Sequence, residues 1–156
     1  MGGAPREYPL AVSSILHATD FSGASGAAFK AAIEMARRDR AELLLLHVLS
    51  PPAPLVADAY VTPSVWTTLI QSQRASAQRQ IDALVEKARR ARVRAQGLLV
   101  DGVPADSIVR TARARHAGMI VVGTHGRTGA ARFFLGSVAG RVVATAHCPV
   151  LTVRGR

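Results

Sequence analysis

A glycine-rich segment from Gly123 to Val138 carries the residue types that bind phosphate groups. Gly123 and Gly126 lack the Cβ atom that would keep a ligand away from the backbone. Gly136 and Ser137 come directly before a helical pattern, so unpaired N–H groups and the positive end of the helix dipole would face an anion. The Ser137 hydroxyl can donate as well. This spacing predicts a phosphate site.

The residues between these glycines add charge and one titratable group. Arg127 and Arg132 could contribute positive charge, and His125 could contact phosphate or relay a proton. A solvent-exposed loop histidine is an equal alternative for His125. The glycines could also serve only a flexible loop and a tight helix entry, with Ser137 as the N-cap. Their place after a predicted strand favours the phosphate site.

Two common nucleotide motifs are absent from the sequence. No G-x-x-x-x-G-K-[ST] occurs, so the lysine of a P-loop is missing. No G-x-G-x-x-G follows the first predicted strand either. A P-loop NTPase and a classical dinucleotide-dependent dehydrogenase are therefore disfavoured.

The elements that must position this segment alternate between apolar runs and helical patterns, which is typical of βαβ units and a parallel sheet. The expected helices are one that begins after Ser22, one from about Ser64 to Arg92, one that starts near Pro104 and is closed by Gly118 as a left-handed cap, and one over Ser137–Ala146. The expected strands are Val12–Ala18, Glu42–Leu49, Arg94–Val100, Met119–Val122 and Pro149–Val153. Right-handed crossovers then give an α/β fold, a doubly wound five-stranded parallel sheet.

In such sheets, ligands bind beyond the carboxyl ends of the strands. Thr19 and Asp20 end the first strand, His47 and Val48 the second, and Gly123 the fourth. Asp20 could orient a nucleotide or, through water, a magnesium ion held mainly by phosphates. Its alternative role is to cap the helix entry near Ser22.

Beyond the glycine pattern, whole segments match a known family. The spacing Gly123-x2-Gly126-x9-Gly136-Ser137 matches the ATP-binding pattern of the universal stress protein family. The segments Ile15–Ser22, Leu46–Val48 and Ala146–Val153 resemble that family's first, second and final strands. The resemblance covers about residues 12–154, so residues 1–156 are expected to form one such domain. One mild departure is Ala18, where the family often has proline.

The resemblance also implies a fold, a ligand and an assembly. The fold would be Rossmann-like, of the adenine nucleotide alpha hydrolase-like kind, with strand order 3-2-1-4-5. Two copies would pair through the last strand (Val150, Leu151, Val153), which the open edge of an apolar strand favours independently. In the nucleotide site, Thr19, Asp20 and Val48 would line the adenine and ribose, Val122 and Gly123 the nucleoside, and Gly126, Gly136, Ser137 and Val138 the phosphates.

Composition narrows the remaining classes. The sequence has twenty basic and ten acidic residues, and eighteen of the twenty basic residues are arginine. These arginines are spread along the sequence and no nucleic-acid module accompanies them, so a solvated helix surface is favoured and no specific nucleic acid is expected. No apolar run is long enough to span a membrane, no signal peptide is evident, and the single Cys148 suits a reducing compartment. The cytoplasm is the expected location.

Other candidate residues suggest packing rather than chemistry. His17, His47 and His147 lack metal-ligand spacing and are expected to pack or hydrogen-bond. Cys148 has no acid–base pair nearby and is expected to be inert. Tyr60 and Trp66 could shield a site, although a core anchor is the safer interpretation.

The sequence as a whole predicts an ATP-binding module for stress response or signalling, with Mg²⁺ held mainly through phosphates. No residue is assigned as catalytic, because the loop has no carboxylate or lysine pair to act as a base on phosphate. Two alternatives stay open: a slow ATPase or nucleotidyl-transferring enzyme on the same scaffold, and a dimeric interaction protein that binds no nucleotide.

Overall fold

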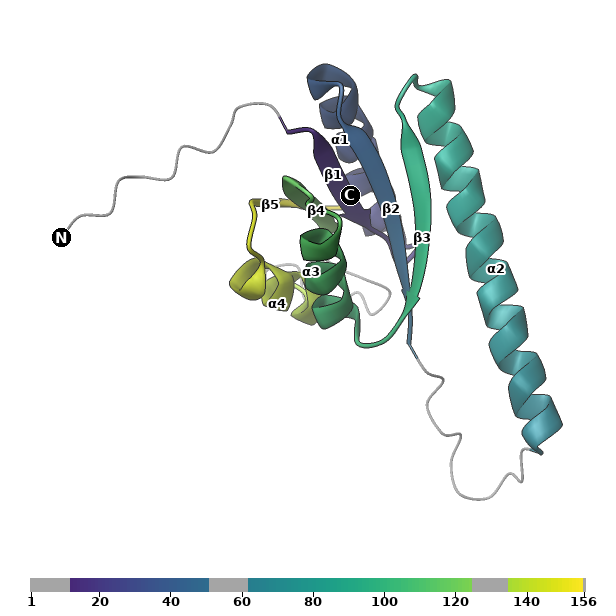
Figure 1. Cartoon of the computed structure of the whole chain (residues 1–156). Helices are drawn as coiled ribbons and strands as arrows, with labels where there is room; N and C mark the ends of the chain where they lie inside the picture. The colour runs from purple at the N-terminus through teal and green to yellow at the C-terminus, as the bar shows by residue number, and fades with distance from the viewer. Residues whose placement is uncertain (1–11, 51–61, 125–134, 156) are drawn as a thin grey trace.

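A five-stranded parallel sheet forms the centre of the computed structural model, which describes residues 12–50, 62–124 and 135–155 (Figure 1). The strand order is β3-β2-β1-β4-β5, as the family resemblance implies. β1 pairs with β2 and β4, and β5 forms one edge of the sheet. The strands are β1 (Ser14–Ala18), β2 (Glu42–Leu49), β3 (Ala95–Asp101), β4 (Met119–Gly123) and β5 (Val150–Val153).

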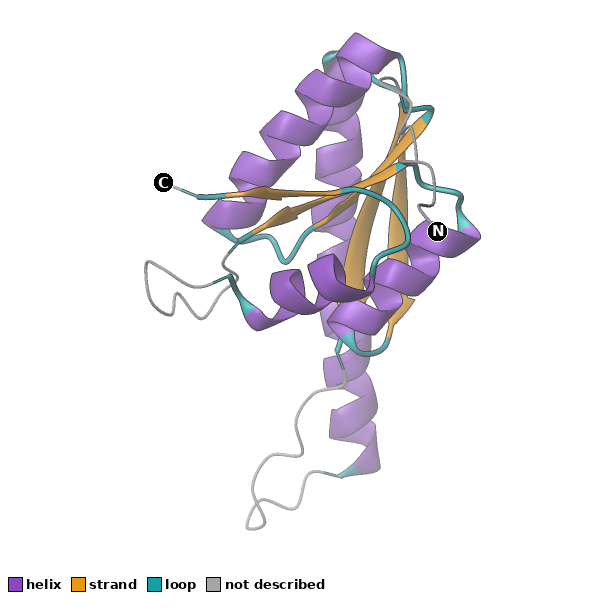
Figure 2. Ribbon diagram, turned by 90° about the vertical axis from the view of Figure 1, so that its left-hand side faces the viewer, coloured by secondary structure: helices purple, strands orange, loops and turns teal. Residues whose placement is uncertain are grey.

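Helices cover both faces of this sheet (Figure 2). α1 and α2 pack on one face of the sheet, and their buried residues belong to one hydrophobic cluster. α3 and α4 pack on the other face, and their buried residues belong to a second cluster. The helices are α1 (Gly23–Asp39), α2 (Pro63–Arg90), α3 (Pro104–Ala114) and α4 (Ser137–Thr145). Among the described residues, no helix has the length and apolar composition needed to cross a bilayer.

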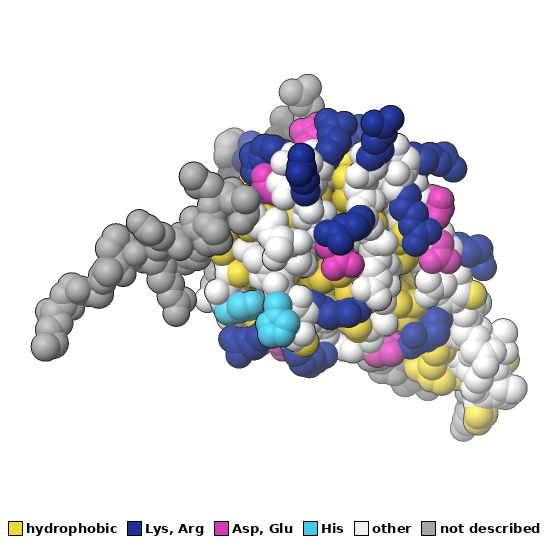
Figure 3. Space-filling model, turned by 45° about the horizontal axis from the view of Figure 1, so that its top comes forward, with side chains coloured by type: hydrophobic (Ala, Val, Ile, Leu, Met, Phe, Trp, Pro, Cys, Tyr) yellow, Lys and Arg dark blue, Asp and Glu magenta, His cyan; other side chains and the backbone are white. Residues whose placement is uncertain are grey.

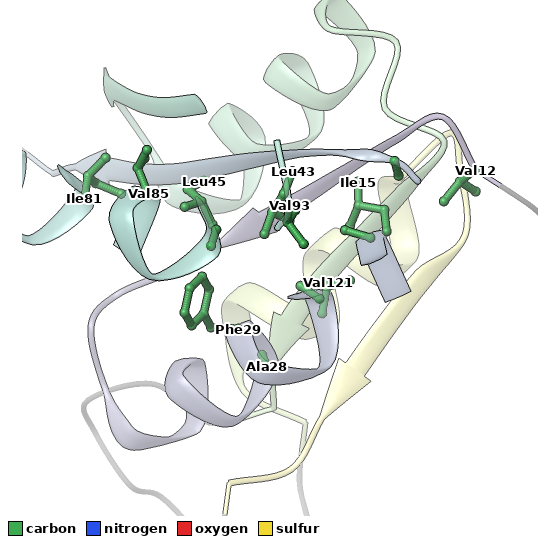
Figure 4. Packing of buried hydrophobic residues seen from close by; sticks show 14 residues of the cluster. Val12, Ile15, Ala28, Phe29, Leu43, Leu45, Ile81, Val85, Val93 and Val121 are labelled. Carbon is green, nitrogen blue, oxygen red and sulfur yellow. The ribbon is translucent and has the colours of Figure 1, made fainter. Parts of the chain in front are cut away.

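The core is aliphatic and built around β2. Leu43 and Leu45 face α1 and α2, while Leu44 and Leu46 face α3 and α4. Figure 4 shows the first of these clusters, with Phe29 of α1 close to Leu45. Since β2 is buried on both faces, its nearly continuous run of leucines is what a central parallel strand requires.

α2 is longer than the sheet that it covers. Its buried residues, Ala77, Ile81, Val85 and Ala88, all lie in its second half. The first half extends past the end of the sheet (Figures 1 and 2). Trp66 lies in this extension and belongs to neither buried cluster, so its interpretation as a core anchor is wrong. Tyr60 lies outside the described residues.

The prediction for Gly118 is also wrong. α3 ends at Ala114, and the left-handed residue that follows it is His116, with a φ of 52°. Gly118 instead donates its N–H to the Ser14 carbonyl, 2.9 Å away. A Cβ at position 118 would lie 3.2 Å from Val12 side-chain atoms, so the glycine permits close packing rather than a turn. Most other predicted boundaries differ by one or two residues, as expected where helices fray.

Candidate functional site

A pocket with a volume of about 350 Å³ opens at the carboxyl ends of β1, β2 and β4. Its floor comes from these strand ends, and its walls come from the first turns of α3 and α4. This volume is at the lower end of the range for small-molecule sites. The lining residues are Ala18, Thr19, Asp20, Ser25, Leu46, His47, Val48, Pro104, Ile108, Val122, Gly123, Thr124, Gly136, Ser137, Val138 and Ala139.

Side-chain hydrogen bonds order the loop between β1 and α1. The hydroxyls of Thr19 and Ser25 are 2.8 Å apart, and the N–H of Phe21 donates to the Thr19 hydroxyl. Ser22 caps α1, because its hydroxyl accepts from the N–H of Ser25. Phe21 has a φ of 63°, which turns the chain sharply into the helix. The loop therefore presents Asp20 to the pocket from a hydrogen-bonded frame.

Asp20 lies at the helix entry and at the pocket. Its carboxylate accepts the N–H of Ser22 at 3.0 Å, which stabilises the helix entry, and it also lines the pocket. Partial burial acts to raise the pKa of Asp20, but hydrogen bonds from Ser22 and Ser25 outweigh it, so the pKa lies below its ordinary value. Asp20 is therefore ionised at neutral pH and offers a negative charge to the pocket.

His47 lines the pocket from β2. Its Nδ1 lies 2.8 Å from the carbonyl oxygen of Thr19, and its ring stacks on that of Phe21 at 4.4 Å. A carbonyl can only accept, so Nδ1 of His47 carries a proton and donates it to Thr19. The sequence indicates a packing or hydrogen-bonding role for His47, and the structure confirms it.

Gly123 ends β4 against the start of α1. A Cβ at this position would lie 2.9 Å from the carbonyl carbon of Ala24 and 3.1 Å from the backbone nitrogen of Ser25. The missing side chain thus allows β4 and α1 to approach closely. We expected a glycine at position 123 because a ligand would approach the backbone there. The close contact with α1 is a different reason for the glycine, although Gly123 also lines the pocket.

The start of α4 forms the opposite wall. Gly136 is the N-cap residue, has no side-chain cap, and donates its own N–H to the Thr124 carbonyl at 2.7 Å. The first N–H that α4 pairs internally is that of Gly140, which donates to Gly136. The N–H groups of Ser137 and Val138 thus lie in the first turn, where a helix provides no acceptor and favours an anion. Ser137 is therefore the first helical residue rather than the N-cap.

α3 completes the wall with apolar surface. Pro104 occupies the first turn, and Ile108 lies one turn further on and is buried. An ion pair of 3.1 Å between Asp106 and Arg141 joins α3 to α4. Because both side chains are about half exposed, this pair adds little to stability.

The structure brings the described candidate residues together in one pocket. All eight described candidates line the pocket: Thr19, Asp20, Val48, Val122, Gly123, Gly136, Ser137 and Val138. Candidates His125, Gly126 and Arg127 lie outside the described residues, as does Arg132. The pocket also contains residues that the sequence does not single out, chiefly Pro104 and Ile108. Both could have been recognised as pocket residues from their position at the start of the helix that follows β3.

The remaining polar groups of the described residues have structural roles. Within the described residues, no group of three or more His, Cys, Asp or Glu side chains could hold a metal ion. Burial raises the pKa of the Cys148 thiol, so the thiol is largely protonated at neutral pH, as the sequence predicts for an inert cysteine. His17 is fully buried under α1, with Nδ1 3.1 Å from the Val121 carbonyl.

The sheet order, the layers and the position of the pocket define a Rossmann-like α/β protein with a pocket at the carboxyl edge of its sheet. The family model for the universal stress protein family matches residues 12–154. The chain therefore belongs to the universal stress protein family.

Individual relatives agree with this assignment. The chain is 36% identical to a universal stress protein of Methanocaldococcus jannaschii, over 87% of this chain and 78% of the relative. The universal stress protein UspA from Lactobacillus plantarum has a similar structure, with a TM-score of 0.77 at 26% identity, over 92% of this chain and 99% of that chain. A universal stress protein from Archaeoglobus fulgidus in complex with dAMP shares the fold, with a TM-score of 0.66 at 24% identity, over 90% of this chain and 96% of that chain.

Proposed function

We propose that the protein is an ATP-binding module for stress response or signalling, with weak or no hydrolysis. The observation that carries this proposal is the convergence of three strand ends and the first turn of α4 on one pocket. Apolar side chains of Val48, Ile108 and Val122 suit the faces of a base, and the first turn of α4 suits phosphate. The Archaeoglobus fulgidus protein with dAMP supports the proposal to the extent that its fold accommodates an adenine nucleotide.

The titratable side chains of the pocket support nucleotide binding rather than rapid hydrolysis of phosphate. Among the described lining residues, the only acidic or basic side chains are Asp20 and His47. Nδ1 of His47 is committed to Thr19, and Asp20 is hydrogen-bonded to the helix entry. Because the pKa of Asp20 lies below its ordinary value, Asp20 is not poised as the base that phosphate hydrolysis would favour.

Magnesium fits this pocket as an ion brought with the nucleotide. The ionised Asp20 carboxylate is a hard oxygen ligand of the kind that Mg²⁺ prefers. Since a single carboxylate does not form a protein cage, phosphate oxygens and water would supply the other ligands. Bound Mg²⁺ would neutralise phosphate charge beside Asp20. We expect ATP to bind more weakly without Mg²⁺, and Asp20→Asn to reduce that difference.

Calorimetry with ATP and Mg²⁺ tests the nucleotide site. Gly136→Val should abolish measurable binding, because a branched side chain at the N-cap crowds the anion position while its φ of −56° remains accessible to valine. Gly140→Ala on the same helix is the matched control, since its Cβ would have only one contact, with Leu135 at 3.8 Å. If folded wild-type protein gave no heat with millimolar ATP, the result would support the alternative of an interaction protein that binds no nucleotide.

We also propose that two copies pair through β5, as the resemblance implies. β5 is an edge strand with Val150, Leu151 and Val153 half buried. The carbonyls of Pro149 and Val153 accept from β4, so the backbone groups of Thr152 point to the open edge. Thr152→Pro removes an outward N–H without touching the pairing with β4, and should shift the sedimentation of the protein to that of a monomer. Thr152→Val keeps this N–H and should leave the dimer intact. A wild-type monomer at micromolar concentration contradicts the pairing.

In this proposal the protein works in the cytoplasm as one domain over residues 1–156. Its single cysteine, Cys148, is compatible with a reducing compartment. Fractionation of the native host, with the protein followed by antibody, tests this location.

A further inference from the structure

The edge of the sheet opposite the pocket gathers the ends of three helices. Parallel strands all begin at this edge, so α1, α2 and α3 end there. Backbone hydrogen bonds tie the connections together: Leu43 donates to the Arg94 carbonyl at 2.8 Å, and Glu42 donates to the Ser13 carbonyl at 2.9 Å. The Arg115 guanidinium reaches Gln96 at the start of β3, 3.2 Å away.

Ten exposed cations occupy these helix ends and the connections that follow them, and we call this surface the basic edge. Figure 3, in which the top of Figure 1 is turned forward, shows Lys and Arg side chains across this surface, with a smaller number of acidic side chains between them. The acidic residues at these helix ends and strand starts are Asp39, Glu42 and Glu86. The ten cations are Arg37, Arg38, Arg40, Lys87, Arg89, Arg90, Arg92, Arg94, Arg113 and Arg115.

Most of this charge is not neutralised within the described chain. Arg38 pairs with Asp39, and Arg89 pairs with Glu86. Seven of the ten form no hydrogen bond or ion pair with another described side chain: Arg37, Arg40, Lys87, Arg90, Arg92, Arg94 and Arg113. A helix C-terminus is stabilised by one or two cations in its last turn. Arg92 and Arg94 lie beyond the last turn of α2, so the helix dipole does not account for them.

The backbone at the basic edge gives a second, independent observation. α1, α2 and α3 each end in the same motif, in which one residue adopts a left-handed conformation. These residues are Arg40, Arg92 and His116, with φ values of 56°, 63° and 52°. Glycine is strongly preferred at this position because a Cβ is strained there. The chain therefore places two arginines and a histidine where glycine would stabilise the fold.

The chemistry of the basic edge selects among anionic partners. Nine of the ten cations are arginine, whose planar fork matches phosphate oxygens in a bidentate way. None of the large apolar side chains exposed in the described chain lies at this edge. A protein partner or a membrane would need such an apolar centre. None of the described Phe or Trp residues lies there either, so the large aromatic rings on which single-stranded bases stack are missing from this edge.

From these observations we propose that the basic edge binds the phosphate backbone of a nucleic-acid duplex without reading its sequence. An open hollow lined by Arg89, Arg92 and Arg94 lies between the end of α2 and the start of β3 and would receive one backbone strand. The strands begin about 4.8 Å apart and the helix layers lie about 10 Å from the sheet, so the basic edge is about 20 Å across. This width corresponds to about half a turn of a nucleic-acid duplex. Contact with few phosphates makes the binding weak and strongly dependent on salt.

The test uses the full chain and a fluorescently labelled duplex of about two turns, followed by anisotropy over a series of salt concentrations. Wild-type protein should bind duplexes of unrelated sequence with similar affinity, and the affinity should fall linearly with salt on logarithmic axes. The variant Arg40→Gly with Arg92→Gly removes two cations and relieves two strained positions. It should lower affinity about tenfold at low salt and reduce the salt slope by about 2, while its melting temperature stays equal or rises. A loss of binding that came from a damaged fold would lower the melting temperature instead.

The control variant Lys30→Gln with Arg79→Gln removes the same charge from exposed positions in the middle of α1 and α2. It should retain clearly more affinity than the glycine variant. Equal losses in the two variants would mean that net charge alone drives binding and would overturn the basic edge as a site. If polyglutamate of matched charge bound as tightly as the duplex, the surface would be assigned to acidic protein segments and the proposal would be overturned. The absence of duplex binding at low salt would overturn it as well.

Discussion

Nδ1 of His47 on β2 lies 2.8 Å from the carbonyl oxygen of Thr19, the residue that follows β1. This hydrogen bond joins two neighbouring strand ends at the floor of the pocket. It also defines the tautomer of His47, because the carbonyl requires a donor. The stacking of His47 on Phe21 extends the same connection into the loop before α1. The geometry of the loop that holds Asp20 thus depends on a side chain from another strand.

Replacing His47 with leucine should therefore affect both stability and binding. The lost hydrogen bond should lower the free energy of unfolding by about 1 kcal/mol. ATP affinity should fall several-fold because the loop that carries Asp20 loses its support. Urea denaturation and calorimetry measure the two effects. His147→Leu, at an exposed position, is the control and should change neither; unchanged ATP affinity in His47→Leu would remove His47 from the site.

Gly123→Ala should destabilise the protein even though it adds only a methyl group. The new Cβ would lie 2.9 Å from the Ala24 carbonyl carbon, and backbone cannot move aside as a flexible side chain can. We expect a loss of about 1–3 kcal/mol in the free energy of unfolding. Gly26→Ala in α1 is the matched control, since nothing lies within 4 Å of its Cβ. This control should be stabilising by about 0.5–1 kcal/mol, and equal stabilities for the two variants would contradict the close contact of β4 with α1.

Acid should destabilise the protein through His17. Burial lowers the pKa of His17 to about 4 from 6.5, against smaller raising effects of the Val121 carbonyl and Asp20. Between these pH values the unfolded chain binds a proton that the folded protein excludes, so stability falls as pH drops from 6.5 towards 4. The full difference amounts to about 3 kcal/mol.

The variant His17→Gln isolates this contribution because it cannot titrate in this range. Denaturation midpoints measured between neutral pH and pH 4 should decline less steeply for the variant than for the wild type. In the described part of the chain, Nε2 of His17 is buried without a hydrogen-bond partner, so the variant loses no partner at that atom. Parallel pH profiles for the two proteins would show that His17 titrates normally.

Cys148 should react slowly with thiol reagents. Burial raises the pKa of its thiol, so less thiolate is present at neutral pH than in a free cysteine. Alkylation of the folded protein should proceed more slowly than that of glutathione, and unfolding in urea should remove the difference. Faster alkylation in the folded state would mean that an unrecognised group activates this thiol.

Local pattern determined much of this protein. The apolar run of Glu42–Leu49 specifies a central strand, and the alternation of strands with helices specifies the sheet, because side-chain periodicity follows directly from backbone geometry. The pocket residues at strand ends were predictable for the same reason: in a parallel sheet every carboxyl end lies at one edge. Ser22, Asp20 and Gly136 could each be placed from their positions next to helical patterns.

Relationships between distant segments were decided only by the tertiary structure. Gly123 is a glycine because α1 passes within van der Waals distance of β4, and no feature of the sequence near Gly123 indicates that contact. The arginines that look dispersed along the chain converge because three helices end at the same edge of the sheet. Sequence periodicity reports how a segment is built, whereas charge density depends on which segments the crossovers bring together.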